Sequence, residues 1–324
     1  MEIKNKSNVY VMAAAAMLIA APAAAQSYPV KPVRVIVPYA AGGNTDYTAR
    51  AVGAKLGEIL GQQVVVENRP GAGTNIGTEL VVKAPADGYT LLMGGAANAI
   101  NMSLLAKPPY DTLRDLVPVS WCVQGANVLS VHPSLPAKNL KELIALARAR
   151  PGKLNFASSG VGGSNHMAGE LLNVMAKINI VHVPYKGNNP ALADAVGGHV
   201  EMIISGVPAL QPLIQSGKLR AIAIGSRERF AAIPDVPTFI EAGLPGYEST
   251  NWFGLMAPAK TPRDIINRLN VETDKVLRNP ELKSRFHNAG LDAKGGTPET
   301  FGAFIRSEID KYANVVKLAG VSRQ

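Results

Sequence analysis

Short apolar runs alternate with longer amphipathic segments over most of the chain. The run 33–37 (VRVIV) is almost continuously apolar, which is typical of a parallel strand buried on both faces. After it, Ala49, Val52 and Leu56 recur at helical spacing. The further expected strands are 64–67, 89–93, 154–158, 179–183, 201–205 and 220–224. The expected helices are 45–60, 75–83, 97–105, 139–149, 165–177, 190–197, 208–216, 262–278, 280–288 and 298–319. This alternation predicts parallel sheets with helices on both faces.

Two such series follow each other along the chain, and extended segments connect them. Residues 117–131 read as one or two extended segments, and residues 249–258 read as a return crossing. We therefore predict an α/β protein of two doubly wound domains with an interdomain cleft. The first domain comprises residues 26–124 plus 250–324, and the second comprises residues 125–249. Ligands of open α/β sheets bind beyond the carboxyl ends of the strands, so the cleft is the expected binding site.

The first 25 residues have the pattern of a signal peptide. Lys4 and Lys6 precede an apolar stretch, 9–21, and Ala23 and Ala25 fit the small-residue positions of a cleavage site after Ala25. The alternative is a membrane anchor, but the apolar stretch is short for a membrane span. We therefore expect an exported protein.

The charge and the cysteine content exclude several classes of protein. The net charge of +9 favours anionic partners, but Lys and Arg are scattered and do not interleave with aromatic residues, so we expect no nucleic acid. Cys122 is the only cysteine, which excludes an internal disulfide, and we expect it to be a buried apolar residue. The five histidines show no metal-ligand spacing, so we expect neither a metal nor another cofactor.

Glycine-rich turns recur where an expected strand runs into an expected helix. They lie in residues 38–50, 68–77, 158–171 and 185–194. A helix start presents unpaired backbone N–H groups and the positive end of the helix dipole, so such turns suit an anion. The spacing G-x-G-x-x-x-G in the second turn is not that of a dinucleotide site, and no phosphate-binding P-loop motif is present. The turns therefore predict a site for an anionic or polar ligand.

Other interpretations of the same residues remain open. The first turn could be an ordinary one in which Asp46 caps the helix. The cleft could hold a hydrolase that uses Ser164 and His166, although no nucleophile–base motif is legible. His166 could contact the ligand or pack within the second domain, and Lys186 is interpreted as a solvated loop lysine.

The chain resembles the Bug solute receptors, the periplasmic binding proteins of tripartite tricarboxylate transporters. The likeness rests on YPVKPVRVIVPYAAGGNTDYTAR, ENRPGAGTNIGTELVVKAPADGYTLL, GVGGSNHMAGELL, VPYKGNNPALADAVGGHV and the terminal TPETF, which occur in family order. It implies a type II periplasmic binding protein fold that closes on a dicarboxylate, an aromatic acid or an amino acid. It implies no enzyme activity and a membrane permease as the partner of a monomeric receptor. A receptor that presents its ligand to a membrane sensor is the alternative.

The same resemblance implies which residues bind the ligand. They are Tyr39, Ala40 and Gly43, with Asp46 fixing their loop, Thr74 and Asn75 of the second loop, and Ser159, Gly163, Ser164, Asn165, Asn188 and Ser205 of the second domain. One carboxylate is expected to bind mainly to backbone groups of the first two loops. Tyr39 stands where the family often has Phe, and Thr74 stands where Gly is common. Both departures bear on which carboxylate binds.

Overall fold

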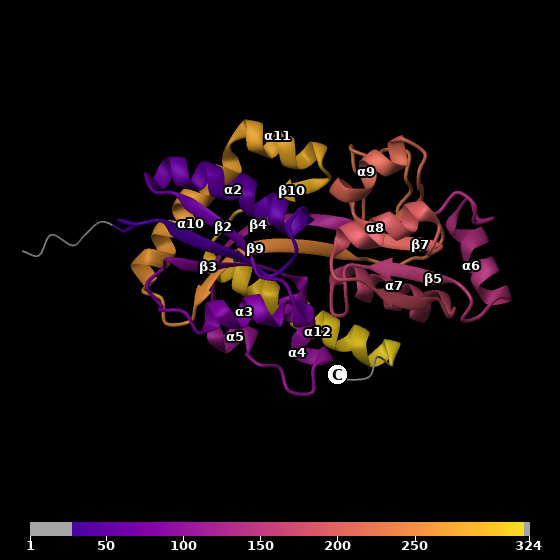
Figure 1. Cartoon of the computed structure of the whole chain (residues 1–324), viewed down its shortest axis with the longest axis horizontal. Coiled ribbons are helices and arrows are strands. Elements are labelled where there is room, and N and C mark those ends of the chain that lie inside the picture. The colour runs from indigo at the N-terminus through magenta and orange to yellow at the C-terminus, as the bar shows by residue number, and fades with distance from the viewer. Residues whose placement is uncertain (1–27, 321–324) are drawn as a thin grey trace, which may run out of the picture. The chain divides into compact units, whose positions relative to one another are not determined.

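A mixed sheet runs through the computed structural model, which describes residues 28–320; the predicted signal peptide lies outside the described residues. The strands follow one another in the order β2 (Val64–Asn68), β1 (Val33–Val37), β3 (Thr90–Gly95), β9 (Thr250–Pro258), β4 (Leu116–Val131), β7 (Met202–Gly206), β5 (Asn155–Ser158) and β6 (Val181–Pro184). Two further strands, β8 (Arg220–Ile224) and β10 (Leu291–Ala293), also pair with β4. Figure 1 shows these strands between layers of helices.

The two ends of the sheet are parallel and its centre is antiparallel. Strand β1 pairs in parallel with β2 and β3, and β5 pairs in parallel with β6 and β7. Between them, β9 and β4 run antiparallel to each other and to their outer neighbours β3 and β7. We call the β2-β1-β3 side with its helices the first lobe and the β7-β5-β6 side with its helices the second lobe. The long strands β4 and β9 connect the lobes.

Helices cover both faces of each lobe (Figure 1). In the first lobe they are α2 (Asn44–Leu60), α3 (Asn75–Val82), α4 (Ala96–Leu104), α5 (Thr112–Asp115), α10 (Arg263–Arg278), α11 (Pro280–Asn288) and α12 (Pro298–Ala319). In the second lobe they are α6 (Leu140–Ala149), α7 (Ser164–Ala176), α8 (Asn188–Gly197) and α9 (Val207–Gln215). A short 3₁₀ helix, η1 (Ala72–Thr74), precedes α3.

The alternation of side chains along the second-lobe strands explains why helices pack on both faces of this lobe. Phe156 of β5 and Met202 of β7 belong to one buried cluster, which also contains residues of α6 and α7. The next residue of each strand, Ala157 and Ile203, belongs to another cluster with residues of α8 and α9. Because successive side chains of a strand point to opposite faces, a near-continuous apolar strand supports a helix layer on each side.

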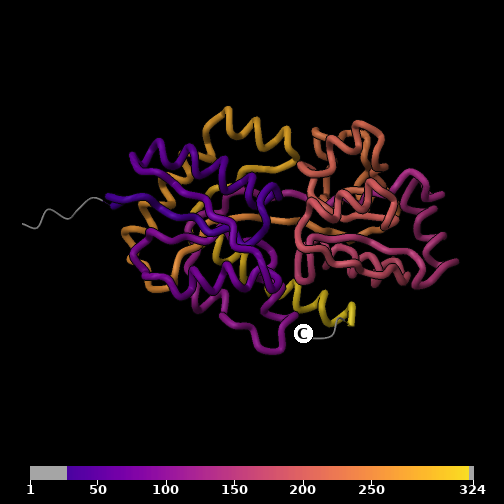
Figure 2. The backbone as a smooth tube through the Cα atoms, in the orientation of Figure 1, coloured from indigo at the N-terminus to yellow at the C-terminus, as the bar shows by residue number. Residues whose placement is uncertain are grey.

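The last helix, α12, packs against both lobes. Its residues Tyr312, Val315 and Val316 share a buried cluster with first-lobe residues and with Met167 of α7. Figure 2 traces this yellow segment from the first lobe to the vicinity of the second. Within the same region, the indole of Trp252 donates a buried hydrogen bond of 3.0 Å to Glu308. The helix thus links the two lobes beside the crossing strands.

The predicted strands and helices are present, with small shifts at their ends. The extended region 117–131 is one strand, β4, whose register with β9 shifts between Pro118 and Ser120 and between Trp121 and Val123. The elements α5 and β10 were not predicted. Cys122 is buried, as expected, and burial raises the pKa of its thiol to about 12.

The proposed domain boundaries fall on the two crossing strands. Residues 124 and 125 lie within β4, residue 249 directly precedes β9, and residue 250 is the first residue of β9. Of the described residues, 31–320 form one unit, so the division into two domains stays a prediction. Within residues 28–320, no helix combines the length and the apolar character that a membrane span needs.

Candidate functional site

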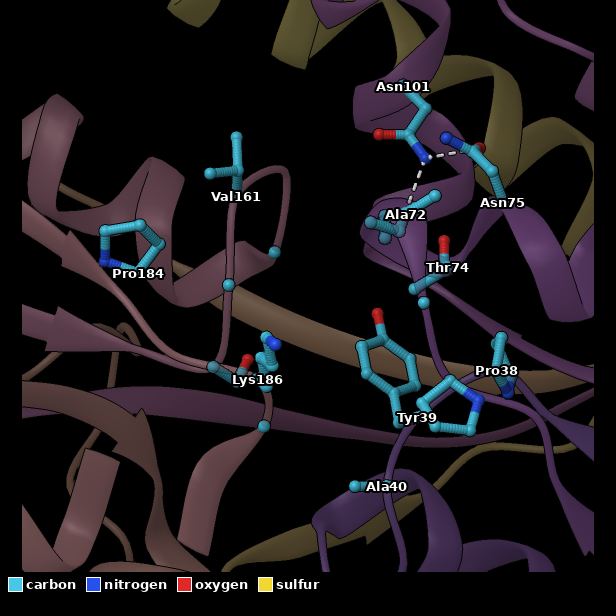
Figure 3. A pocket seen from close by; sticks show the side chains of 18 of the residues that line it. Pro38, Tyr39, Ala40, Ala72, Thr74, Asn75, Asn101, Val161, Pro184 and Lys186 are labelled. Atoms are coloured by element: carbon cyan, nitrogen blue, oxygen red, sulfur yellow. Dashed lines mark hydrogen bonds between the residues drawn. The ribbon is translucent and has the colours of Figure 1, made fainter. Parts of the chain in front are cut away.

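A cavity of about 590 Å³ lies between loops of the two lobes. The first lobe contributes the turn after β1, the segment 70–75 and part of α4, and the second lobe contributes the turns after β5 and β6. Figure 3 shows Thr74 and Asn75 on one side of this space and Val161, Pro184 and Lys186 on the other. Ligand sites of α/β folds are expected at such strand ends.

A smaller polar space of about 70 Å³, which we call the polar chamber, adjoins the cavity. Both spaces are lined by Tyr39, Ala40, Ser159, Gly163 and Gly187. The remaining lining of the chamber is rich in amides and hydroxyls and consists of Gly43, Asn44, Thr45, Asn127, Ser164, Asn165, Asn188, Ser205, Gly206, Asn251 and Phe253. Among the described residues that line the cavity or the chamber, none is acidic.

The N-termini of α2, α7, α8 and α9 converge on the polar chamber. Their N-cap residues are Gly43, Gly163, Gly187 and Gly206, all of which line the chamber, and none supplies a side-chain cap. The first-turn N–H groups of a helix have no partner within the helix, and here no N-cap side chain satisfies them. Each N-terminus also carries the positive end of a helix dipole. The chamber is therefore suited to an anion.

Glycines allow the loops of the two lobes to approach each other. A Cβ atom at Gly206 would lie only 1.9 Å from the side-chain nitrogen of Asn44. At Gly42 the corresponding distance to the side-chain nitrogen of Asn189 is 3.2 Å, and at Gly73 the distance to the carbonyl oxygen of Val161 is 3.3 Å. The lobes thus meet around the chamber, and a side chain added at these points would have to displace a group of the other lobe.

Asp46 lies beneath the first loop and fixes its conformation. Its carboxylate accepts hydrogen bonds from the Gly42 N–H (2.9 Å), from Arg50 (3.1 Å) and from the Asn68 amide (3.0 Å). Asn68 also donates to the carbonyl of Tyr39 at 3.0 Å. Burial alone would raise the pKa of Asp46, but these hydrogen bonds outweigh it and lower the pKa. The N-cap of α2 is Gly43, so Asp46 organises the loop and does not cap the helix.

Tyr39 borders both spaces from the first lobe. Its side chain is half-buried and stands beside Pro38 at the edge of the cavity (Figure 3). Burial, and to a smaller extent the neighbouring Tyr110, raise the pKa of its hydroxyl. The hydroxyl therefore stays protonated at neutral pH and is able to donate a hydrogen bond.

The second loop differs from the expected backbone clamp. The N–H of Thr74 donates to the carbonyl of Gly71 at 3.1 Å, and the N–H of Asn75 donates to the carbonyl of Ala72. These two N–H groups are therefore engaged within the loop. Thr74 has a φ of 82°, which is unusual for a β-branched residue. Its hydroxyl is buried and has no hydrogen-bond partner within the described part of the chain.

His166 stabilises the turn that follows β5 in the second lobe. Its Nδ1 accepts a hydrogen bond from the Gly162 N–H at 3.3 Å, and its ring stacks on His182 with centroids 4.0 Å apart. Burial lowers the pKa of His166 to about 4, so the ring is neutral at pH 7. It does not line the cavity or the chamber. With Nδ1 engaged by the loop, His166 is poorly placed to serve as a base for Ser164.

The structure brings nearly all of the predicted binding residues together. Those that line the cavity or the chamber are Tyr39, Ala40, Gly43, Thr74, Asn75, Ser159, Gly163, Ser164, Asn165, Asn188 and Ser205. Asp46 is the exception, since it lies under the loop. Sequence reasoning missed Asn127 and Asn251 on the crossing strands, and the apolar wall formed partly by Leu104 and Leu105. Residues 28–320 contain no group of three or more His, Cys, Asp or Glu side chains placed to hold a metal ion.

Comparison with known proteins identifies the family. The family model described as the tripartite tricarboxylate transporter family receptor matches residues 48–321. The chain belongs to this family. Protein BugT of Bordetella pertussis is 41% identical over 304 residues, which are 93% of each chain. The resemblance to the Bug receptors is thereby confirmed.

Solved structures of related proteins support the same assignment. The periplasmic binding protein BugD is 33% identical with a TM-score of 0.87, and the match covers 92% of this chain and 100% of BugD. Rpa4515 of R. palustris, solved with adipate, is 36% identical with a TM-score of 0.87, and the match covers 90% of this chain and 98% of that one. The predicted fold class is confirmed, and the family's solved members are solute-binding proteins, not enzymes. Membership of this receptor family implies a periplasmic location.

Proposed function

We propose that this receptor captures a small carboxylate (a dicarboxylate, an aromatic acid or an amino acid) and delivers it to the permease of a tripartite tricarboxylate transporter. The observation that carries the proposal is the convergence of the glycine-capped N-termini of α2, α7, α8 and α9 on a chamber without acidic lining. Directed N–H groups of this kind stabilise a carboxylate with little reorganisation.

The bound carboxylate would favour closure of the lobes. The donors of α2 belong to the first lobe, whereas those of α7, α8 and α9 belong to the second. A ligand that contacts both sets binds the closed arrangement more tightly than an open one, and so shifts the population toward closure. The binding of adipate by the related Rpa4515 is consistent with this class of ligand.

We propose the remaining features of the receptor on the same basis. A signal peptide ends at Ala25, the first domain comprises 26–124 plus 250–324, and the second comprises 125–249. The mature receptor acts as a monomer.

In the alternative function, the ligand-bound receptor presents its ligand to a membrane sensor. Loss of ligand uptake in cells that lack this receptor but keep the permease would favour transport over sensing.

A thermal-shift screen against mono-, di-, tri- and aromatic carboxylates and amino acids tests the proposal. A ligand at 100 times its Kd stabilises the folded state by about 2.7 kcal/mol, which gives a clear rise in Tm. Asn188→Asp places a negative charge in the chamber and should abolish the rise. Asn314→Asp, on an exposed position of α12, is the matched control. If no carboxylate raises the Tm of the wild-type protein, the proposal is wrong.

A further inference from the structure

We propose that the ammonium group of Lys186 binds the second carboxylate of a dicarboxylate whose first carboxylate occupies the polar chamber. Lys186 then sets the preference of the receptor for dianions over monocarboxylates. This inference rests on the proposed function and narrows it to one class of ligand, namely dicarboxylates with a hydrocarbon spacer. Lys186 is exposed, as expected of a solvated loop lysine, and it also lines the cavity.

Lys186 supplies the charge that the rest of the site lacks. Of the described residues that line the cavity or the chamber, Lys186 alone carries a charge. It belongs to the turn after β6 and borders the cavity, but not the chamber. Figure 3 shows its side chain at the second-lobe wall, across the cavity from Tyr39. A carboxylate in the cavity therefore has one cationic side chain to pair with.

The ammonium group of Lys186 is available for a ligand. Within residues 28–320, no acidic side chain forms an ion pair with it. Arg50, the basic residue beside the first loop, instead pairs with Asp46 at 2.9 Å. A cation without a protein partner at the edge of a cavity without acids attracts anions.

The walls of the cavity fit a hydrocarbon spacer. The apolar residues that line the cavity are Pro38, Ala40, Pro70, Ala72, Ala97, Leu104, Leu105, Val161 and Pro184. The amide of Asn101 is already bonded, since it donates to the carbonyl of Gly73 at 2.9 Å and to the side-chain oxygen of Asn75 at 3.0 Å. A ligand with charges along its middle would lose water against these apolar residues, and the described lining offers it no cationic partner besides Lys186. This favours an α,ω-dicarboxylate over a polyanion such as citrate.

The backbone holds Lys186 in a fixed place relative to the chamber. The next residue, Gly187, is the N-cap of α8, and its N–H donates to the carbonyl of Ser159 at 3.1 Å. Tyr185, the preceding residue, donates its hydroxyl to Asp194 at 2.7 Å. The same turn thus presents a helix N-terminus to the chamber and an ammonium group to the cavity. The two carboxylates of one ligand can bind to these neighbouring groups.

Adipate and hexanoate form a matched pair that isolates the second carboxylate. Both have six carbons, and they differ in one terminal group. Calorimetric titration of wild-type protein should give tighter binding of adipate than of hexanoate. In Lys186→Met the ratio of the two affinities should fall up to about fivefold, as expected for loss of a charge pair that involves an exposed lysine. Lys186→Arg should restore most of the ratio, because it keeps the charge.

A surface lysine and the salt dependence serve as controls. Lys153→Met removes an exposed lysine of the second lobe that lies outside both spaces, and it should leave the ratio unchanged. Added salt should weaken adipate binding more in the wild-type protein than in Lys186→Met, because salt screens the pair. Equal affinities for adipate and hexanoate, or a ratio that survives Lys186→Met, would overturn this inference while leaving carboxylate capture intact. Failure of every carboxylate to bind would refute the proposed function itself.

Discussion

The hydroxyl of Ser205 donates a hydrogen bond of 2.7 Å to the side-chain oxygen of Asn188. The bond joins the end of β7 to the first residue of α8, at the lining of the polar chamber. Because the oxygen of the Asn188 amide is engaged, its nitrogen remains to donate toward the chamber. Ser205 therefore orients a donor and need not contact the ligand.

Ser205→Ala should weaken adipate binding about fivefold, since a misoriented neutral donor costs on the order of 1 kcal/mol. The Tm of the unliganded protein should change little, because the lost hydroxyl is small and lies beside the chamber. Calorimetric titration measures the first effect and thermal unfolding the second. Ser216→Ala removes an exposed hydroxyl at the end of α9 and is the control. Unchanged affinity in Ser205→Ala would show that the Asn188 amide is not a donor to the ligand.

Gly206→Ala tests whether the loops must meet for tight binding. The backbone of Gly206 (φ −73°, ψ 156°) is accessible to alanine, so the effect is steric. The added Cβ would lie 1.9 Å from the side-chain nitrogen of Asn44 in the other lobe. We expect at least a tenfold loss of adipate affinity, because either the Asn44 side chain must leave its place at the chamber or the loops must separate.

The control for this variant is Gly302→Ala within α12, where the nearest atom to the new Cβ would be 3.4 Å away. It should keep the wild-type affinity. Both variants should unfold cooperatively, and small-angle scattering with saturating adipate should show less compaction for Gly206→Ala than for the wild-type protein. Full compaction of Gly206→Ala would contradict the steric argument.

Much of the fold was predictable because local patterns determine it. The run 33–37 is apolar except for Arg34 and forms β1, and the glycine-rich turns after the strands begin helices as expected. The two elements that were not predicted, β10 and α5, are too short to show a periodic pattern of apolar residues. Strand β10 has three residues and exists through its pairing with β4. Helix α5 has four residues, and its N-cap is Asp111, whose carboxylate accepts from two backbone N–H groups.

The candidate site was predictable at its loops and less so elsewhere. Residues that follow a strand and begin a helix, such as Ser164 and Asn188, are recognised from their neighbours in the sequence. Asn127 and Asn251 are far apart in the chain and meet only because β4 and β9 pair antiparallel, with 3.4 Å between their amides. The engaged N–H of Thr74 was also not foreseeable, since it depends on the positive φ values of its loop.

Asp46→Asn should weaken both the first loop and ligand binding. An amide keeps the size of the side chain but removes the charge that Gly42, Arg50 and Asn68 stabilise. Hydrogen bonds to a charged group are worth roughly 1.5–3 kcal/mol each. Because Arg50 is exposed, solvent weakens its pair with Asp46, and we expect the unfolding free energy to fall by about 2 kcal/mol in total.

Urea denaturation at pH 7 measures this loss. Because the folded-state pKa of Asp46 is lowered, its contribution is present above the unfolded-state pKa and disappears as the pH falls through the folded value. The difference between wild-type protein and Asp46→Asn should therefore vanish in acid. Asp264→Asn, an exposed first-turn residue of α10, is the matched control. A difference that persists below the folded-state pKa would contradict the charge argument.

The stacked rings of His166 and His182 should make the protein sensitive to mild acid. Burial lowers the pKa of His166 to about 4 and, with a smaller contribution from His166, lowers that of His182 to about 3. The unfolded chain binds these protons near pH 6.5, whereas the folded protein does not, so stability rises with pH between the folded and unfolded values. Lowering the pH from 7 to 5 should therefore lower the unfolding free energy by about 1–2 kcal/mol per histidine.

His166→Gln tests this effect. The unfolding free energy of the variant, measured by urea denaturation at pH 7 and pH 5, should change less between the two pH values than that of the wild-type protein, whatever its value at pH 7. The exposed His287→Gln of α11 should keep the wild-type slope. An equal slope in His166→Gln would show that the stack is not the acid-sensitive element.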